Sequence, residues 1–378
     1  MEVKIQRSQL LSHLQRAQNI VERKTTLPIL AHILMETESS GLRLSSTDLE
    51  VGVTEACEAQ IVKEGSTTIH ARKFFEIIRE IPDGEIHLRQ KEEQLEIRAG
   101  RSRFRLRSLS PEEFPKIPAI ETTESVKLST SIFQEMIQKV FVSVSSDETR
   151  YTLTGILTHM LRENDETVLR MVATDGHRLS FCERKLPDTD CLSGFQKTSE
   201  GQERDIILPK KGVQEIRRLM EEGVGDLEFG LFQENAFIRK DNLSMIMRLV
   251  QGKFPDYVAV FPGEIESVIT AEASVLEESL RRVSVLSTEK SKGIRFSVKP
   301  DKLTFFSNSP EIGDAEEEVD VEYAGEDFEV AFNVRYLLDF LQTVKGKISI
   351  EFGAGFKPCV MREKDDLKYS YIVMPLRI

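Results

Sequence analysis

One sequence pattern occurs three times in this chain of 378 residues. An apolar helical segment is followed each time by an alternating strand that begins at a glycine, namely Gly84, Gly225 and Gly346. These glycines stand a domain's length apart, well beyond the about 20–45 residues of a solenoid repeat. The pattern therefore predicts three similar domains arranged in tandem.

The segment before each glycine begins with basic residues and continues with apolar residues at helical spacing, which predicts a helix with one buried stripe. The basic residues are Arg72-Lys73, Lys210-Lys211 and Arg335. The apolar sets that follow them are Phe74, Phe75, Ile77 and Ile78; Val213, Ile216 and Leu219; and Leu337, Leu338 and Leu341.

The first half of each repeat has its own pattern, a short strand followed at once by an amphipathic helix. The strands are marked by Val3 and Ile5, by Val126 and Leu128, and by Val268 and Thr270. Two repeats carry a related turn, Thr47-Asp48-Leu49 and Thr174-Asp175-Gly176, and two end in a Phe-Pro pair, Phe114-Pro115 and Phe254-Pro255. We therefore expect an α+β chain with domains at 1–122, 123–264 and 265–378.

Composition agrees with folded domains, since 40% of the residues are hydrophobic and can fill three cores. No apolar run approaches the roughly 20 residues that span a bilayer, and no signal peptide begins the sequence, so we expect a cytoplasmic protein without a membrane partner. The cysteines are scattered, which argues against a zinc site or a disulfide framework, and no cofactor is expected. They are Cys57, Cys182, Cys191 and Cys359.

The formal net charge of −12 argues at first against nucleic acid. Charge distribution matters more than the total, because a local basic surface can bind phosphates on an acidic protein. Basic pairs recur in all three repeats, at Arg23-Lys24, Arg72-Lys73, Lys210-Lys211 and Arg281-Arg282. Any one pair is typical of a solvated helix face, but the recurrence favours a shared surface for DNA.

Catalysis has little support in the sequence. The segment Ala173 to Leu179 offers Asp175, His177 and Arg178 together, but neighbouring residues on a strand or turn point in different directions. Asp175 is better explained as ordering a turn at Gly176, and a hydrolase using Asp175 and His177 ranks last. The main alternative to a DNA-binding protein is an oligomeric scaffold that binds peptides and does not encircle DNA.

Eight segments in order along the chain resemble the bacterial DNA polymerase III beta subunit, the sliding clamp. They are Thr26 to Leu30, Thr47 to Glu50, Ala71 to Phe75, Gly100 to Phe104, Ala173 to Leu179, Gly252 to Tyr257, Phe332 to Val334 and Val373 to Ile378. The resemblance implies a non-enzymatic, ring-shaped homodimer of clamp domains, with helices lining the inside and antiparallel sheets outside, that tethers the replicative polymerase to duplex DNA. It also implies a clamp loader and other proteins with a clamp-binding motif as partners.

A ring held on DNA by topology needs only weak, sequence-independent phosphate contacts. We expect Lys24, Arg72, Lys210 and Lys211 to make such contacts.

Ring closure requires complementary surfaces. The segment Arg101 to Arg107 alternates, with arginines on one face and Phe104 and Leu106 on the other, and Asp314 to Glu318 supplies acidic residues. The resemblance implies that Phe104 and Leu106 meet Val285 and Leu286 of the second chain. The expected interface comprises Lys73, Arg101, Arg103, Phe104, Arg105, Leu106, Val285, Leu286, Glu316 and Glu317.

The resemblance also implies a hydrophobic groove, between the second and third domains, that holds a short peptide of polymerase or clamp loader. The matching positions are Leu153, Thr174, Gly176, His177, Arg178, Leu179, Pro255, Val260, Asn333, Tyr336, Phe356, Val373, Met374, Pro375, Leu376 and Arg377. Two departures stand out: Val258-Ala259-Val260 replaces a segment that often holds an arginine, and Leu186 to Glu203 is a longer loop.

Overall fold

The structure is a computed structural model of the whole chain. It describes residues 1–22, 26–39, 41–121, 125–164, 166–186, 205–220, 224–286, 293–309, 312–353 and 357–377. The chain divides into two compact units. Unit 1 comprises the described residues of Met1–Ser131 and Lys211–Leu249, and unit 2 comprises those of Ile132–Cys191, Phe195–Lys210 and Val250–Ile378. The second sequence repeat is thus divided between the units.

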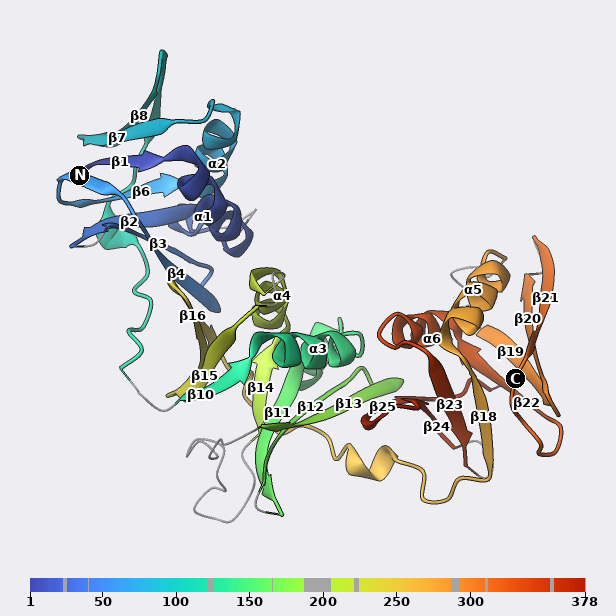
Figure 1. Ribbon diagram of the computed structural model, residues 1–378. Helices are drawn as coiled ribbons and strands as arrows, with labels where there is room; N and C mark the ends of the chain where they lie inside the picture. Colours follow the sequence, from blue (N-terminus) through green and yellow to red (C-terminus); the bar gives the residue numbers. More distant parts are fainter. Residues whose placement is uncertain are drawn as a thin grey trace. The chain divides into compact units, whose positions relative to one another are not determined.

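Unit 1 contains two antiparallel sheets (Figure 1). The five-stranded sheet has the order β5-β1-β7-β8-β9. Its strands are β1 (Glu2–Gln6), β5 (Gln60–Lys63), β7 (Glu85–Lys91), β8 (Gln94–Ala99) and β9 (Ser102–Arg107).

The eight-stranded sheet of unit 1 has the order β10-β15-β16-β17-β4-β3-β2-β6, so it joins strands of the first and second repeats. Its strands are β2 (His32–Glu38), β3 (Gly41–Thr47), β4 (Val51–Cys57), β6 (Ser66–His70), β10 (Ser125–Ser129), β15 (Asp226–Phe232), β16 (Asn235–Lys240) and β17 (Leu243–Arg248).

Unit 2 repeats this plan. An eight-stranded sheet has the order β14-β11-β12-β13-β25-β24-β23-β18, and a four-stranded sheet has the order β21-β20-β19-β22. The strands of the larger sheet are β11 (Gly155–Glu163), β12 (Glu166–Thr174), β13 (Arg178–Leu186), β14 (Ile206–Pro209), β18 (Ser267–Glu272), β23 (Lys347–Phe352), β24 (Cys359–Glu363) and β25 (Asp366–Val373). Those of the smaller sheet are β19 (Gly293–Lys299), β20 (Lys302–Ser309), β21 (Gly313–Asp320) and β22 (Phe328–Asn333).

Each repeat supplies two α-helices at the positions that the apolar spacing predicts. They are α1 (Arg7–Ile20) and α2 (Ala71–Glu80), α3 (Thr130–Phe141) and α4 (Lys210–Leu219), and α5 (Ala273–Ser284) and α6 (Val334–Leu341). Short 3-10 turns are η1 (Pro28–Ala31), η2 (Pro111–Glu113), η3 (Glu148–Leu153) and η5 (Val258–Val260). The helix predictions are therefore confirmed for all three repeats.

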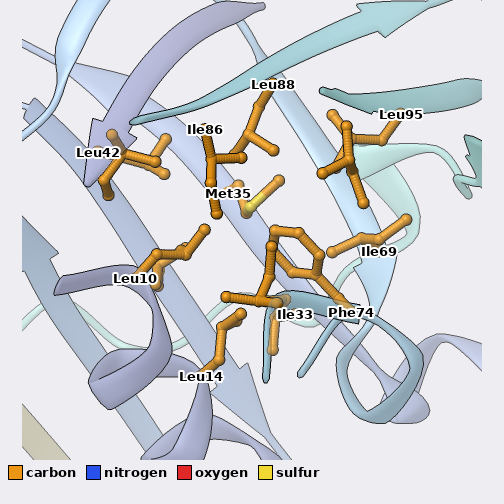
Figure 2. Close-up of a cluster of buried hydrophobic side chains, with 14 of the residues drawn as sticks. Leu10, Leu14, Ile33, Met35, Leu42, Ile69, Phe74, Ile86, Leu88 and Leu95 are labelled. Carbon is orange, nitrogen blue, oxygen red and sulfur yellow. The ribbon is translucent and has the colours of Figure 1, made fainter. Parts of the chain in front are cut away.

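The core of the first repeat lies where α1 and α2 meet both sheets of unit 1 (Figure 2). Leu10 and Leu14 of α1 and Phe74 of α2 are at most 1% exposed and pack with strand residues such as Ile33 and Leu88. Full burial of such a side chain contributes roughly 1.5–3 kcal/mol. This apolar contact fixes the helix pair against the sheets.

Unit 2 is also held by a charged cluster, where α3 meets strands β13 and β25. The ammonium of Lys139, whose side chain is 7% exposed, lies 2.6 Å from a carboxylate oxygen of Asp366 and 3.0 Å from one of Glu135. Arg184 contacts the same two carboxylates, at 2.5 Å and 2.6 Å. The cluster connects residues of the second repeat to Asp366 of the third.

This cluster predicts a pH-dependent stability of unit 2. Burial by itself raises the pKa of Asp366, but hydrogen bonds from Lys139 and Arg184 outweigh it and lower that pKa below its ordinary value. A carboxyl group with a lowered folded-state pKa stabilises the fold above its unfolded pKa and loses this effect as the pH falls through the folded value. In urea unfolding, Asp366→Asn should cost about 1.5–3 kcal/mol at neutral pH and progressively less as the pH falls below about 3.9, the ordinary pKa of aspartate. An equal loss at neutral and at acidic pH would contradict this account.

Candidate functional site

The Thr174-Asp175-Gly176 turn joins β12 to β13 and is fixed by its own side chains. The hydroxyl of Thr174 donates to the carbonyl of Arg178 at 2.7 Å. One carboxylate oxygen of Asp175 accepts the backbone N–H groups of His177 and Arg178 at 2.9 and 3.1 Å. Gly176 has a φ of 88°, which favours glycine. The interpretation of Asp175 as a turn-ordering residue agrees with this geometry.

A groove of about 180 Å³ lies beside this turn, entirely within unit 2. Its apolar base is formed by Leu153, Leu179 and Ile372, which are each at most 5% exposed. Tyr257 and Val260 are partly buried against the same apolar cluster. The full lining is Arg150, Leu153, Thr174, Gly176, His177, Arg178, Leu179, Pro255, Asp256, Tyr257, Val260, Ile372 and Met374.

Arg178 fixes one wall of the groove by bridging β13 to α6. Its guanidinium donates to Asp175 at 3.1 Å and to Asp339 at 2.5 Å, and it lies 4.3 Å from the ring centroid of Tyr336. Burial would lower the pKa of Arg178, but the hydroxyl of Tyr371 and the carboxylate of Asp339 raise it. Arg178 therefore stays charged, and most of its hydrogen-bonding capacity is used inside the protein.

Of the sixteen groove positions predicted from sequence, nine line this groove. Phe356 lies outside the described residues. The remaining six do not line it: Tyr336 stacks on Arg178, Asn333 caps α6, Val373 is fully buried, and Pro375, Leu376 and Arg377 follow β25.

The carboxyl-terminal segment is anchored through its backbone. Met374 donates an N–H to the carbonyl of His177 at 2.9 Å, and Leu376 donates to that of Ala331 at 2.7 Å. Both side chains remain 38% exposed. The segment is thus held in place while its apolar side chains stay accessible.

Four lining residues were not predicted from sequence: Arg150, Asp256, Tyr257 and Ile372. Asp256 and Tyr257 belong to the Gly252 to Tyr257 motif, so the sequence motif could have identified them as lining residues. Ile372 lines the groove because it pairs directly with Leu179 across β13 and β25. No local sequence pattern reveals this strand register.

The site has the character of a binding surface. The His177 side chain is exposed, and both carboxylate oxygens of Asp175 serve the turn and Arg178. No group of three or more metal-ligating side chains occurs among the described residues. An apolar base with a charged rim suits an apolar peptide segment.

The predicted DNA-contacting residues have different environments. Lys24 lies outside the described residues, and Arg72 is half-buried on α2. Lys210 donates to the hydroxyl of Ser146 at 2.8 Å. Lys211 forms an ion pair with Asp48, whose side chain is 3% exposed. Lys211 therefore has a structural partner that the sequence did not indicate.

The predicted interface residues lie on or next to edge strands, except Lys73 on α2 and Val285 and Leu286 after α5. β9 ends the five-stranded sheet and β21 ends the four-stranded sheet. Phe104 is 36% exposed, and Val285, just after α5, is 78% exposed. Arg101 precedes β9 in the turn, whereas Arg103, Arg105 and Arg107 share one face of the strand.

Several of these charges are paired within the chain. Arg103 and Arg105 contact Glu96 of β8, whose side chain is 2% exposed, and Lys73 lies 2.7 Å from Glu76. Burial would raise the pKa of Glu96, but Arg103 lowers it to about 2. Glu317 pairs with Arg282 at 2.5 Å.

No helix in the described part of the chain is long and apolar enough to cross a membrane.

Comparison with known proteins covers the whole chain. Family models of the DNA polymerase III beta subunit match its N-terminal domain at residues 1–118, its central domain at 127–256 and its C-terminal domain at 258–377. The chain is 33% identical to the beta sliding clamp of Caulobacter vibrioides and 34% identical to that of Pseudomonas aeruginosa, with 100% of each sequence covered.

Solved structures agree. A Caulobacter crescentus beta sliding clamp matches with a TM-score of 0.92 at 34% identity, and a Bartonella birtlesii sliding clamp bound to griselimycin matches with a TM-score of 0.93 at 30% identity; each match covers 100% of both chains. The predicted α+β fold of three clamp domains is confirmed, and a dimeric ring is consistent with these relatives. The chain belongs to the family of the DNA polymerase III beta subunit, the bacterial sliding clamps.

Proposed function

We propose that the chain serves as a DNA sliding clamp by closing with a second copy into a ring around duplex DNA and by presenting the groove beside Leu179 to polymerase and clamp loader. In this function the clamp is a processivity factor without catalysis, and it acts in the cytoplasm. The domains of the ring are 1–122, 123–264 and 265–378.

The single observation that carries the ring is how neighbouring repeats join. The third strand of one three-strand meander pairs with the third strand of the next: β4 pairs with β17, and β13 pairs with β25. The corresponding strands left at sheet edges are β9 and β21. Unpaired edge strands expose backbone donors and acceptors that favour pairing with another chain.

Pairing β9 of one copy with β21 of a second copy would repeat the same join. Because a twofold axis makes this contact twice, two chains close a ring. The apolar residues Phe104 and Leu106 would then meet Val285 and Leu286. The basic residues Lys73, Arg101, Arg103 and Arg105 would face Glu316 and Glu317.

This interface predicts that Arg103→Glu with Arg105→Glu yields monomers in sedimentation velocity. Reversed charges would repel the acidic β21 and would also face Glu96 within their own sheet. Arg295→Glu is a suitable control, because Arg295 is a half-exposed arginine on β19, the inner neighbour of β20 in the four-stranded sheet. A double variant that sediments as the unmodified dimer would exclude this interface.

For DNA contact we propose Lys24, Arg72, Lys210 and Lys211. Lys210 and Lys211 begin α4, and Arg72 lies in the first turn of α2. Repetition of basic residues at equivalent helix starts supports a common surface for the phosphates. Lys211 also has a second role in the fold, because it pairs with Asp48.

Each phosphate contact should contribute about 0.9 to the slope of log affinity against log salt concentration. We expect Lys210→Ala and Arg72→Ala each to reduce that slope by about this amount in fluorescence anisotropy with duplex DNA. Lys116→Ala removes an exposed lysine from the segment between β9 and β10 and should leave the slope unchanged. Unchanged slopes for both helix variants would place these residues away from DNA.

For partner binding we propose the groove between β13, β25 and the Pro255 to Val260 segment, with the six predicted positions that do not line it and Phe356 as its outer contacts. Polymerase, clamp loader and other proteins with a clamp-binding motif would insert apolar side chains over Leu179 and Ile372. Val258 is 63% exposed, so the rim that often holds an arginine is apolar here. The peptide-binding scaffold without DNA remains the alternative, and the salt-dependence experiment separates the two.

The groove predicts that Leu179→Glu abolishes peptide binding. Burial of apolar area contributes roughly 25 cal/mol per Å², and a carboxylate placed in the base of the groove would remove that gain. Met374→Glu should weaken binding at least tenfold, because this side chain lines the groove and is accessible. Both variants should remain dimeric. Wild-type peptide affinity in Leu179→Glu, measured by fluorescence polarisation, would exclude the groove.

A further inference from the structure

Unit 1 contains a second site built on the same plan as the groove of unit 2. In unit 2, Leu179 pairs with Thr174 on one side and with Ile372 on the other. In unit 1, Gly52 pairs in the same way with Thr47 and with Ile246. Gly52 thus occupies the sheet position that corresponds to Leu179.

The turns beside the two sites share their hydrogen bonds. Thr47 donates its hydroxyl to the carbonyl of Val51 at 2.9 Å, and Asp48 accepts the N–H groups of Glu50 and Val51 at 3.0 and 2.7 Å. This is the pattern made by Thr174 and Asp175 in unit 2. The two turns are therefore equivalent in structure as well as in sequence.

The remaining walls also correspond. Leu34 pairs with Ser45 as Leu157 pairs with Val172, so Leu30 and Leu153, each four residues earlier, occupy equivalent positions. Both are buried. Unit 1 therefore provides Leu30, Gly52 and Ile246 where the groove of unit 2 has Leu153, Leu179 and Ile372.

The first site differs because the chain fills it. A Cβ added to Gly52 would lie 3.0 Å from Cγ2 of Ile117 and 3.2 Å from Cγ2 of Ile246. Ile117 packs with the cluster of Ile29, Leu30 and Phe114. The missing side chain at position 52 is thus what allows Ile117 to sit against the sheet.

Ile117 belongs to the connector of unit 1, the described residues between β9 and β10, which passes over Gly52. The connector is fixed at one end by Thr68, whose hydroxyl donates to the carbonyl of Leu109 at 2.7 Å. At the other end, Arg239 donates to the carbonyl of Ile120 at 2.9 Å. Ile117 is therefore held over Gly52 from both sides.

The corresponding connector of unit 2 follows a different course. Phe254 is buried like Phe114, but the next residues pack on Phe181, whose ring lies 6.1 Å from that of Tyr257 and 5.7 Å from that of Phe261. The position equivalent to Phe181 in unit 1 is Thr54, since each lies two residues beyond its partner Leu179 or Gly52. An aromatic side chain thus anchors the second connector beside the groove, which stays open.

We propose that Ile117 is an intramolecular ligand: the chain carries two equivalent grooves and fills the first one itself, so that each chain offers one groove to partner peptides. Without the Ile117 side chain, the groove of unit 1 takes the same class of apolar peptide. This inference rests on the proposed function of the groove in unit 2.

The number of peptides bound per chain tests the inference about Ile117 and the proposed groove of unit 2 separately. The probe is a fluorescein-labelled, uncharged hexapeptide with two large apolar side chains, titrated onto the full chain. We expect one site per chain in the wild type, none in Leu179→Glu, two in Ile117→Ala and one in the double variant. Ile120→Ala, a control in the same connector, should retain one site.

One site in Ile117→Ala together with none in the double variant would overturn the inference and leave the proposed groove intact. Full binding by Leu179→Glu would instead overturn the proposed groove. The two failures are therefore distinguishable.

A second measurement does not depend on peptide. Gly52→Ala should lower the urea midpoint of the wild type, because the new methyl group would meet Ile117 at 3.0 Å. In the Ile117→Ala background the same substitution should cost less, because the contact with Ile117 is gone and only the one with Ile246 at 3.2 Å remains. Equal losses in both backgrounds would show that Ile117 does not occupy this site and would overturn the inference.

Discussion

Backbone pairing between strands of neighbouring repeats is the constraint on which the rest of the structure depends. An edge strand must satisfy the hydrogen bonds of its N–H and C=O groups with water, with a helix or loop that covers it, or with another strand. β4 does so with β17, and β13 does so with β25. These joins turn separate four-stranded sheets into eight-stranded ones, and they explain why the compact units cut through the second repeat. They also leave β9 and β21 as the third strands of their meanders that lie at sheet edges.

The joins are reinforced by charges that the repeats share. Asp48 of the first repeat pairs with Lys211 of the second, while Asp366 of the third repeat pairs with Lys139 and Arg184 of the second. Such pairs are costly to bury singly, because an ion without its partner loses its hydration and gains nothing. The basic residues Lys139, Arg184 and Lys211 of this acidic chain therefore hold neighbouring repeats together.

Small side-chain differences on one sheet face determine what the two equivalent sites can do. Leu179 and Phe181 on β13 anchor the second connector to one side and leave an apolar groove. Gly52 and Thr54 on β4 leave room for Ile117. A conserved backbone plan thus yields one open site and one filled site, since close packing admits either an internal or an external side chain at a given place, never both.

The sequence by itself determined the three repeats, the two helices of each and the turns at Thr47 and Thr174, because these features depend on local periodicity and on turn chemistry. It also identified the arginine strand. The groove lining was expected only from the resemblance to the clamp family, which supplied nine of its thirteen residues. Tertiary structure alone decided that Ile372 joins Leu179 in the groove, that Lys211 binds Asp48, that Glu96 lies among the arginines, and that Ile117 covers Gly52. Each of these contacts joins residues far apart in the chain, and their pairing follows from strand register and from the packing of a connector on a sheet face. Local sequence carries no record of either, since the same alternation of apolar and polar residues fits several registers.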